Sequence, residues 1–343
     1  MQVYNDQFEQ IVSAENLFLA WDEFRRGKQA KADVMKFEWQ LEENIFGLQR
    51  ELSAGHYKHG PYRAFYITDP KQRLIHKASV RDRILHHAIF KILNPVFEPT
   101  FIANSFSCRV GKGTHKGVVT LAKILRRVSQ NHTGPCYALK CDIFKFFASV
   151  DHGILLGILA RHVKDKDTLR LLAAIIGSFN TERTPGKGLP IGNLTSQLFA
   201  NIYMNEFDQF IKHELKVKDY VRYTDDFVIV SDNIEYLWLL LPKIQKFLGD
   251  ALALSLHPSK ITIRKFSQGI DFLGYVILPH HIRLRTKTKR RLQHKLGDRN
   301  AHYMLGAITS QSLNQSWQSY LGVLSHSNSY KLAQKLIKKQ LGG

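Results

Sequence analysis

Apolar positions in the first part of the chain recur at the spacing of helices. The series Phe8, Ile11, Val12 is continued by Leu17 and Trp21, and the same spacing returns between residues 41 and 52. Side chains three and four residues apart lie on one face of a helix, so residues 1–55 are predicted to be helical. The same pattern predicts further helices over 81–93, where Asn94-Pro95 should end the helix, and over 116–128, 165–176, 196–215 and 234–252.

Short runs rich in β-branched and aromatic residues predict strands between these helices. Two runs within residues 61–75 are joined by a turn at Asp69-Pro70-Lys71, and the remaining runs cover 136–141, 220–222, 227–230, 260–263 and 270–277. Asp151 is expected to cap the helix that follows it, and the basic segment from Thr286 predicts two or three more helices. Strands that alternate irregularly with helices favour an α+β fold over a doubly wound parallel sheet.

Composition narrows the class of protein. The chain has 343 residues, of which 44% are hydrophobic and 11% aromatic, as expected for a globular protein. No apolar run has the length of a membrane span, and the N-terminus lacks the pattern of a signal peptide. The three cysteines lack the paired spacing of a zinc site or a disulfide framework. A reducing, cytoplasmic setting is therefore expected, with no membrane partner.

The positive charge of the chain is concentrated at its C-terminal end. The formal net charge is +20, and residues 281–343 hold twelve Lys and Arg (283, 285, 287, 289, 290, 291, 295, 299, 331, 335, 338 and 339) against one acid, Asp298. Such an imbalance repels itself unless a polyanion neutralises it, which indicates nucleic-acid phosphates. The alternative is a solvated surface, but such surfaces usually mix both signs.

Two adjacent carboxylates, Asp225 and Asp226, stand between two strand-like runs and are expected at the tip of a hairpin. Aspartate is also common in turns for backbone reasons alone. A third carboxylate, Asp142, ends the predicted strand 136–141 and could face this tip across one sheet, although a helix N-cap is an alternative use for it. Three such carboxylates would hold two hard cations, which is the arrangement used for in-line phosphoryl transfer.

The order of motifs along the chain closely resembles that of the reverse transcriptases. The matching blocks run from about residue 60 to 325 and comprise Lys71 to Ile75, Arg81 to Arg83, Cys108 to His115, Asp142 to Phe147, Leu189 to Gln197, Tyr223 to Asp226, Lys260, and Phe272 to Tyr275. The resemblance implies an α+β right-hand polymerase fold with an antiparallel palm sheet, helical and β fingers, and a basic helical thumb. It implies fingers with an N-terminal extension over 1–135, a palm over 136–280 with a fingers insertion at about 150–195, and a thumb over 281–343.

The resemblance also implies roles for individual residues and ligands. It implies two Mg²⁺ ions, with Mn²⁺ able to substitute, and binding of template RNA, a cDNA primer and deoxynucleoside triphosphates. The implied catalytic residues are Asp142, Asp225, Asp226 and Lys260, with Ile143 added to the three aspartates among the metal ligands. The implied nucleotide-binding residues are Arg73, Lys71, Phe147 as a steric gate against ribose, Ile191 and Gly192. The implied primer and template contacts are Tyr223, Gln197, Phe272, Gly274, Arg109 and Lys112.

One block points to a subgroup. An aliphatic Ile191 before Gly192, with Ser196-Gln197 closing the block, resembles the pattern of diversity-generating retroelement reverse transcriptases, as does Ser316 to Gly322 with His326. That subgroup implies a prokaryotic or phage-encoded enzyme that copies a template-repeat RNA with errors opposite adenines, together with an oligomeric accessory variability protein. Apolar shape alone discriminates weakly between substrates, so Ile191 could loosen nucleotide selection; alternatively it only packs the loop.

Two further interpretations remain at this point. One is a retron, defence-associated or group II intron-like reverse transcriptase of ordinary fidelity. The other is an inactive RNA-binding scaffold, which the three intact aspartates disfavour, because clustered acids in a basic protein have no evident use without a metal.

Overall fold

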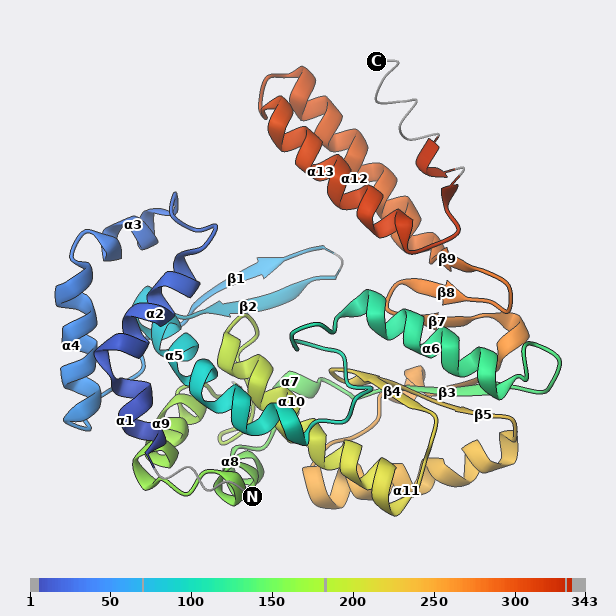
Figure 1. Ribbon diagram of the computed structural model, residues 1–343, viewed down its shortest axis with the longest axis horizontal. Coiled ribbons are helices and arrows are strands. Elements are labelled where there is room, and N and C mark those ends of the chain that lie inside the picture. The colour runs from blue at the N-terminus through green and yellow to red at the C-terminus, as the bar shows by residue number, and fades with distance from the viewer. Residues whose placement is uncertain (1–5, 70, 182–183, 331, 335–343) are drawn as a thin grey trace.

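A four-stranded antiparallel sheet with the order β4-β5-β3-β6 lies in the right-hand half of the computed structural model as drawn in Figure 1, and the structure describes residues 6–69, 71–181, 184–330 and 332–334. The predicted acid hairpin is β4 paired with β5, and β3 lies between β5 and β6. The strands are β3 Tyr137–Asp142, β4 Tyr220–Tyr223, β5 Asp226–Ser231 and β6 Thr262–Lys265.

The two faces of this sheet belong to two different hydrophobic cores. On β5, Phe227 and Ile229 pack into the first core, whereas Val228 and Val230 pack into the second. This is the alternation that a pleated strand imposes. Helix α11 (Ile234–Leu252) contacts β3 and β5 on the side of the first core, and α6 (Thr114–Val128) contacts β4 and β5 on the side of the second (Figure 1). The sheet therefore lies between the two cores and contributes side chains to both.

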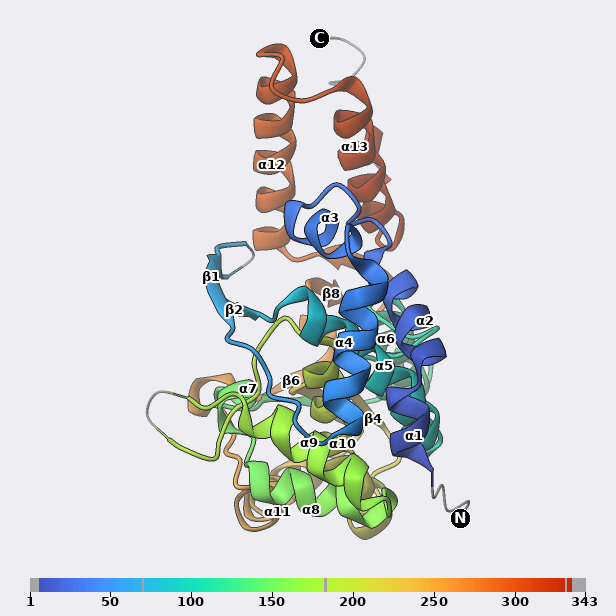
Figure 2. The same ribbon diagram turned by 90° about the vertical axis from the view of Figure 1, so that its left-hand side faces the viewer.

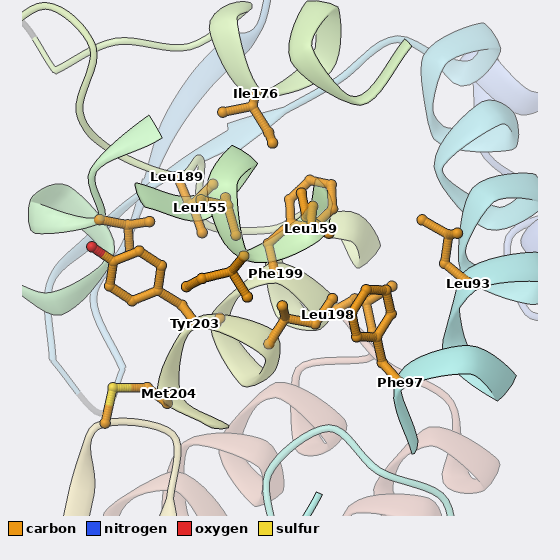
Figure 3. Close-up of a cluster of buried hydrophobic side chains, with 14 of the residues drawn as sticks. Leu93, Phe97, Leu155, Leu159, Ile176, Leu189, Leu198, Phe199, Tyr203 and Met204 are labelled. Atoms are coloured by element: carbon orange, nitrogen blue, oxygen red, sulfur yellow. The ribbon is translucent and has the colours of Figure 1, made fainter. Parts of the chain in front are cut away.

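The first core is built mainly from helices. Figure 3 shows part of it, where Leu93 and Phe97 of α5 approach Leu198 of α10, with Leu159 of α8 beside them. The predicted helical N-terminal segment is confirmed from Gln7 onward, and residues 1–5 of that prediction lie outside the described residues. The helices are α1 Gln7–Val12, α2 Ala14–Arg25, α3 Ala32–Glu38, α4 Leu41–Ser53, α5 Val80–Phe97, α8 His152–His162, α9 Lys166–Gly177 and α10 Leu194–Gln209.

A two-stranded antiparallel hairpin projects from this helical part (Figures 1 and 2). It consists of β1 (Arg63–Ile67) and β2 (Arg73–Lys77), in which Ile67 pairs with Arg73 at the end near the turn. The hairpin agrees with the predicted strand–turn–strand over 61–75, although Pro70 of the predicted turn lies outside the described residues.

The C-terminal part completes the second core. A three-stranded sheet of β7 (Ile270–Phe272), β8 (Tyr275–Ile277) and β9 (Ile282–Leu284) leads into two helices that lie side by side and point away from the rest of the chain (Figures 1 and 2). These are α12 (Thr286–Met304) and α13 (Ser310–Ser325), as predicted for the basic segment. Four of its twelve cations, Lys331, Lys335, Lys338 and Lys339, lie outside the described residues.

Four predicted elements differ from the structure. The strand predicted over 260–263 is β6, which covers Thr262–Lys265, because Lys260 belongs to the short 3₁₀ helix Pro258–Lys260. Helix α5 continues past Asn94-Pro95 to Phe97, because burial of Leu93 and Phe97 outweighs the backbone hydrogen bond that proline removes. Residues 270–277 form a hairpin rather than one strand, since Leu273 and Gly274 both adopt positive φ and reverse the chain. The helix predicted over 196–215 is α-helical only to Gln209 and ends in a π-helical turn.

Two further findings bear on the class of protein. Cys108, Cys136 and Cys141 are all free thiols. Within the described residues, no helix combines the length and the apolar character needed to cross a bilayer.

Candidate active site

The three aspartates singled out in the sequence come together at one end of the four-stranded sheet. Asp142 is the last residue of β3 and pairs directly with Asp226, the first residue of β5. In an antiparallel sheet, directly paired residues point to the same face, with Cα atoms about 4.5–5.5 Å apart. Asp225 precedes Asp226 in the turn between β4 and β5. The register of the sheet thus places one carboxylate opposite an adjacent pair.

Two lysines partly neutralise this cluster. The Nζ of Lys260, in the turn Pro258–Lys260, donates a hydrogen bond to Asp142 Oδ1 at 2.8 Å. The Nζ of Lys140 lies 3.5 Å from Asp226 Oδ2 and also donates to the carbonyl oxygen of Asp271 at 3.0 Å. Lys140 therefore links the acid cluster to the β7–β8 hairpin.

The cluster still has an excess of buried negative charge. Burial raises the pKa of Asp226 to about 6, and the carboxylates of Asp142 and Asp225 add to this rise against the opposing charge of Lys140. Burial, followed by repulsion from Asp142, also raises the pKa of Asp225. In addition, Asp226 Oδ1 is buried and accepts no hydrogen bond from any described residue. A buried carboxylate oxygen without a partner is costly, so a cation would be favoured beside it.

These donors suit a hard divalent cation, because Mg²⁺ is bound through carboxylate oxygens. Within the described part of the chain, however, no three His, Cys, Asp or Glu side chains already stand in the arrangement of a metal cluster. Asp142 instead pairs with Lys260, so a cation at Asp142 would replace or share that contact. Ile143 has an apolar, buried side chain, and only its backbone carbonyl could serve as a ligand.

The turn that carries Asp225 is hydrogen-bonded to a buried ion pair. Thr224 has φ of 56°, and a β-branched residue in this region is strained by roughly 1–3 kcal/mol. Its carbonyl accepts a hydrogen bond from Arg222 Nη1 at 2.9 Å, and its hydroxyl donates to Ser107 Oγ at 2.6 Å. Arg222 is in turn paired with Asp208, and both side chains are fully buried. Asp208 is therefore an ion-pair partner.

Two further predicted site residues, Phe147 and Ile191, are connected by backbone hydrogen bonds around one loop. Phe146 is buried in the first core and Phe147, next to it in α7 (Phe146–Ser149), is half-buried, so the two rings lie in different environments. The carbonyl of Phe147 accepts a hydrogen bond from the Leu189 backbone at 2.7 Å, and the carbonyl of Ile191 accepts one from the His76 backbone at 2.9 Å. Phe147 and β2 thus bracket the loop that contains Ile191.

The loop that contains Ile191 is hydrogen-bonded to β2 and packs closely against it. The Nδ2 of Asn193 donates to the His76 carbonyl at 2.9 Å. Gly192 has φ of 116°, and a Cβ at this position would come within 2.8 Å of Ile75 Cγ2. Glycine is therefore required for the loop to approach β2 so closely.

The cationic residues predicted for nucleotide binding lie at the end of the β1–β2 hairpin. Lys71 and Arg73 are exposed, and the positive charge of Arg73 counteracts the rise in the pKa of Asp225, which indicates that this charge acts on the acid cluster. At the same tip, the Asp69 carboxylate contacts Lys295 Nζ at 2.5 Å and Arg291 Nε at 3.5 Å, both from α12.

The residues predicted to contact primer and template differ in how far their side chains are exposed to solvent. Tyr223 is half-buried, and its hydroxyl accepts a weak hydrogen bond from Thr114 at 3.4 Å. Gln197 is exposed near the start of α10. Phe272 is fully buried, so it packs the second core, while Gly274 forms the turn of the β7–β8 hairpin with φ of 87°.

Arg109 is the most deeply buried of the cationic residues predicted to contact the template. Its guanidinium contacts Glu98 Oε1 at 2.8 Å and donates to the carbonyls of Ile102 and Ser105, at 2.7 and 2.9 Å. Its side chain is only 6% exposed, so in this structure Arg109 stabilises its own loop, and the predicted template contact stays a prediction. Lys112 donates to the Ala103 carbonyl at 2.7 Å but remains partly accessible.

Four contributors to this site were not predicted as such. Lys140 could have been found, because it stands two residues before Asp142 on a strand and therefore points to the same face. Arg222 offers a weaker signal, as an arginine inside an apolar strand implies a buried acid. Ser107 and Asn193 carry no such signal, since their partners lie 117 residues away along the chain.

Comparisons with known proteins agree on one family. The sequence model described as "Reverse transcriptase (RNA-dependent DNA polymerase)" matches residues 64–277, more than half of the chain. "Protein YkfC" of Escherichia coli (strain K12) is 27% identical over 270 residues, which cover 67% of this chain and 70% of that protein. "Group II intron-encoded protein LtrA" of Lactococcus lactis subsp. cremoris is 24% identical over 306 residues, which cover 69% of this chain and 50% of that protein. The chain thus matches only part of the length of these relatives.

Solved structures with similarity to this chain include two telomerases. Telomerase from Candida albicans, in complex with a fragment of telomeric RNA, aligns with a TM-score of 0.49 and 12% identity, covering 67% of this chain and 46% of the other. Apo telomerase from Candida tropicalis aligns with a TM-score of 0.48 and 13% identity, covering 71% and 60%.

Proposed function

Because the chain belongs to the reverse transcriptases, the RNA-dependent DNA polymerases, we propose that it copies an RNA template into cDNA at the carboxylates of Asp142, Asp225 and Asp226. The family match, together with the mixed helices and antiparallel sheet, confirms the expected α+β polymerase fold. Residues 1–135 and about 150–195 would be the fingers, 136–280 the palm and 281–343 the thumb. The observation that carries the proposal is the direct pairing of Asp142 with Asp226, with Asp225 beside it at the tip.

The residues around the acids have complementary roles in this reaction. Two Mg²⁺ ions, or Mn²⁺ in their place, would be held by the three aspartates with the Ile143 carbonyl, and would supply activation of the primer hydroxyl and stabilisation of the leaving oxygen. Arg73, with Lys71, would bind the triphosphate through charge-assisted hydrogen bonds. Lys260, whose Nζ lies 2.8 Å from Asp142 Oδ1, would donate a proton to the departing pyrophosphate.

Phe147 and the loop that contains Ile191 would together determine which nucleotide is accepted. The half-buried ring of Phe147 would lie under the sugar and exclude a 2′-hydroxyl. Tyr223, Gln197, Gly274 and Lys112 would contact primer or template, and Phe272 would support this region by packing beneath it. The basic helix α12 would bind the phosphates of the duplex.

The basic test is primer extension on an RNA template with deoxynucleotides and Mg²⁺. Synthesis should depend on Asp225, so Asp225→Asn should abolish it, whereas Asp250→Asn on the exposed side of α11 should leave it unchanged. Synthesis that persists in Asp225→Asn, or no synthesis by the unaltered chain with any RNA template, would refute the proposal and leave the RNA-binding scaffold as the better description.

For the subgroup, we infer that the chain is the error-prone reverse transcriptase of a diversity-generating retroelement. Support comes from Ile191, whose side chain cannot hydrogen-bond the incoming nucleotide, so that discrimination would rest on shape. Its substrate would then be a template-repeat RNA. The competing candidate is a group II intron-like enzyme of ordinary fidelity, which the similarity to the group II intron-encoded protein favours. Sequencing of the cDNA separates the two, because only the first predicts errors concentrated opposite template adenines.

The error-prone subgroup also implies a partner. We propose that an oligomeric accessory variability protein binds this chain, with RNA bridging the contact because of the strongly positive C-terminal segment. Co-purification that is lost after ribonuclease treatment would support this arrangement. Binding that resists ribonuclease would instead indicate a direct protein interface.

A further inference from the structure

We propose that Thr224 and Ser107 are positioning residues that hold the carboxylate of Asp225 in place for metal binding. This inference rests on the proposed polymerase function and adds to it a pair of hydroxyls that contact neither the substrate nor the metal. The two residues are 117 positions apart in the chain and meet through a hydrogen bond of 2.6 Å.

The position of Asp225 is determined by the residue before it. Thr224 adopts φ of 56°, a conformation that a β-branched residue avoids unless its surroundings enforce it. Its carbonyl and its hydroxyl are each engaged, the first by Arg222 and the second by Ser107. If either contact is lost, the turn can relax and move Asp225 relative to Asp142, which stands on a different strand.

Arg222 provides a rigid base for the turn. Besides Thr224, its guanidinium contacts the Asp208 carboxylate and donates to Ser105 Oγ at 3.0 Å. The same carboxylate accepts a hydrogen bond from the Tyr220 hydroxyl at 2.8 Å. Both charged side chains are fully buried. A buried pair of this kind rarely adds net stability, but it strongly disfavours any arrangement that separates the charges.

Ser107 is held by contacts other than its hydrogen bond to Thr224. It is 3% exposed, and its carbonyl accepts a hydrogen bond from Asn201 Nδ2 of α10 at 2.9 Å. The neighbouring Phe106 donates its backbone N–H to the Arg222 carbonyl at 3.0 Å. The segment around Ser107 is therefore attached to α10 on one side and to β4 on the other, so its hydroxyl is a stationary acceptor for Thr224.

The experiment uses variants that remove a hydroxyl and keep the shape of the side chain. Replacing Asp208 or Arg222 would leave a buried charge unpaired and could prevent folding, so Thr224→Val and Ser107→Ala are preferred. Thr168→Val is the matched control, because this fully buried threonine of α9 also donates its hydroxyl to another side chain, Asp165 Oδ2 at 3.0 Å. Thr224→Ser restores the hydroxyl and serves as the rescue variant.

Two quantities are measured on the full chain. The first is the affinity for Mn²⁺ without nucleic acid, from the paramagnetic resonance signal of the free ion. The second is the Mg²⁺ concentration that gives half-maximal primer extension. For Thr224→Val and Ser107→Ala we expect roughly tenfold weaker Mn²⁺ binding and a similar rise in the Mg²⁺ midpoint. A tenfold change corresponds to about 1.4 kcal/mol, the size of one intramolecular hydrogen bond. Most of the extension rate should return at saturating Mg²⁺.

The outcomes separate this inference from the function on which it rests. The double variant should bind Mn²⁺ no more weakly than either single variant if the two hydroxyls act through one another, and Thr224→Ser and Thr168→Val should behave as the unaltered chain. Unchanged metal affinities in Thr224→Val, or additive losses in the double variant, would overturn the positioning role while leaving the polymerase intact. An unaltered chain that neither binds Mn²⁺ nor extends a primer would remove the proposed function and this inference together.

Discussion

Replacing Asp226 by asparagine should stabilise the metal-free protein near neutral pH while abolishing DNA synthesis. Burial raises the pKa of Asp226 from 3.8 to about 6, and the neighbouring Asp142 and Asp225 contribute to this rise. Between these two pH values the unfolded chain has already released the proton that the folded chain retains. The free energy of unfolding contributed by this group therefore falls as the pH rises from about 4 to about 6, and the full loss persists above pH 6.

The size of the effect follows from the shift. One pKa unit corresponds to 1.36 kcal/mol, so a shift of about two units costs the folded state about 3 kcal/mol at neutral pH. Asparagine removes this cost, and no further offset applies, because the shift already includes the attraction of Lys140, 3.5 Å away. The net expectation is a gain of about 3 kcal/mol for Asp226→Asn at pH 7.5, and little of that gain at pH 4.

The measurement is urea unfolding in the presence of a chelator at both pH values. Asp250→Asn is the control, since Asp250 is an exposed partner of Lys246 and its replacement should leave the stability nearly unchanged. Added Mg²⁺ should narrow the difference between Asp226→Asn and the unaltered chain, because a ligand stabilises only the folded state that binds it. A variant that is no more stable at pH 7.5, or whose gain is equal at pH 4, would refute the reasoning.

Three further predictions concern the chemistry. Phe147→Ala should incorporate ribonucleotides that Phe147→Tyr still rejects, and equal rejection by both in single-nucleotide extension would argue against the steric gate. Ile191→Gln should lower misincorporation opposite template adenines in sequenced cDNA whereas Ile191→Leu should not, and unchanged error frequencies would assign fidelity to other residues. Lys260→Ala should slow single-turnover extension about 10²–10⁴-fold, while Lys265→Ala on exposed β6 should not, and equal rates for the two would exclude Lys260 as the proton donor.

Much of the acid cluster could be predicted from the sequence, because its geometry follows from local rules. Asp142 ends one apolar strand and Asp226 begins another, and antiparallel pairing brings these two ends together without further information. The same period-two rule would have placed Lys140 on the same face. Fold class and the hairpin therefore followed from patterns of a few residues.

The incorrect or missing parts depend on contacts between distant segments. Pro95 stays inside α5 because the core around Phe97 stabilises the last turn, and that core is assembled from other helices. The ion pair of Arg109 with Glu98 was not predicted, because the segment around Glu98 carries no motif that points to it. The contact of Ser107 with Thr224 likewise appears only once the chain has folded.

The sheet that both cores share has a consequence for how the site is assembled. A slip of β5 by one residue against β3 would send Phe227 and Ile229 into the core lined by α6, and would send Val228 and Val230 into the opposite one. The same slip would remove Asp226 from its place opposite Asp142. The larger side chains of Phe227 and Ile229 would then enter the core that is packed around two valines, and the valines would leave space unfilled in the first core. A chain whose two cores are correctly filled therefore already has its carboxylates aligned, before any metal or nucleic acid arrives.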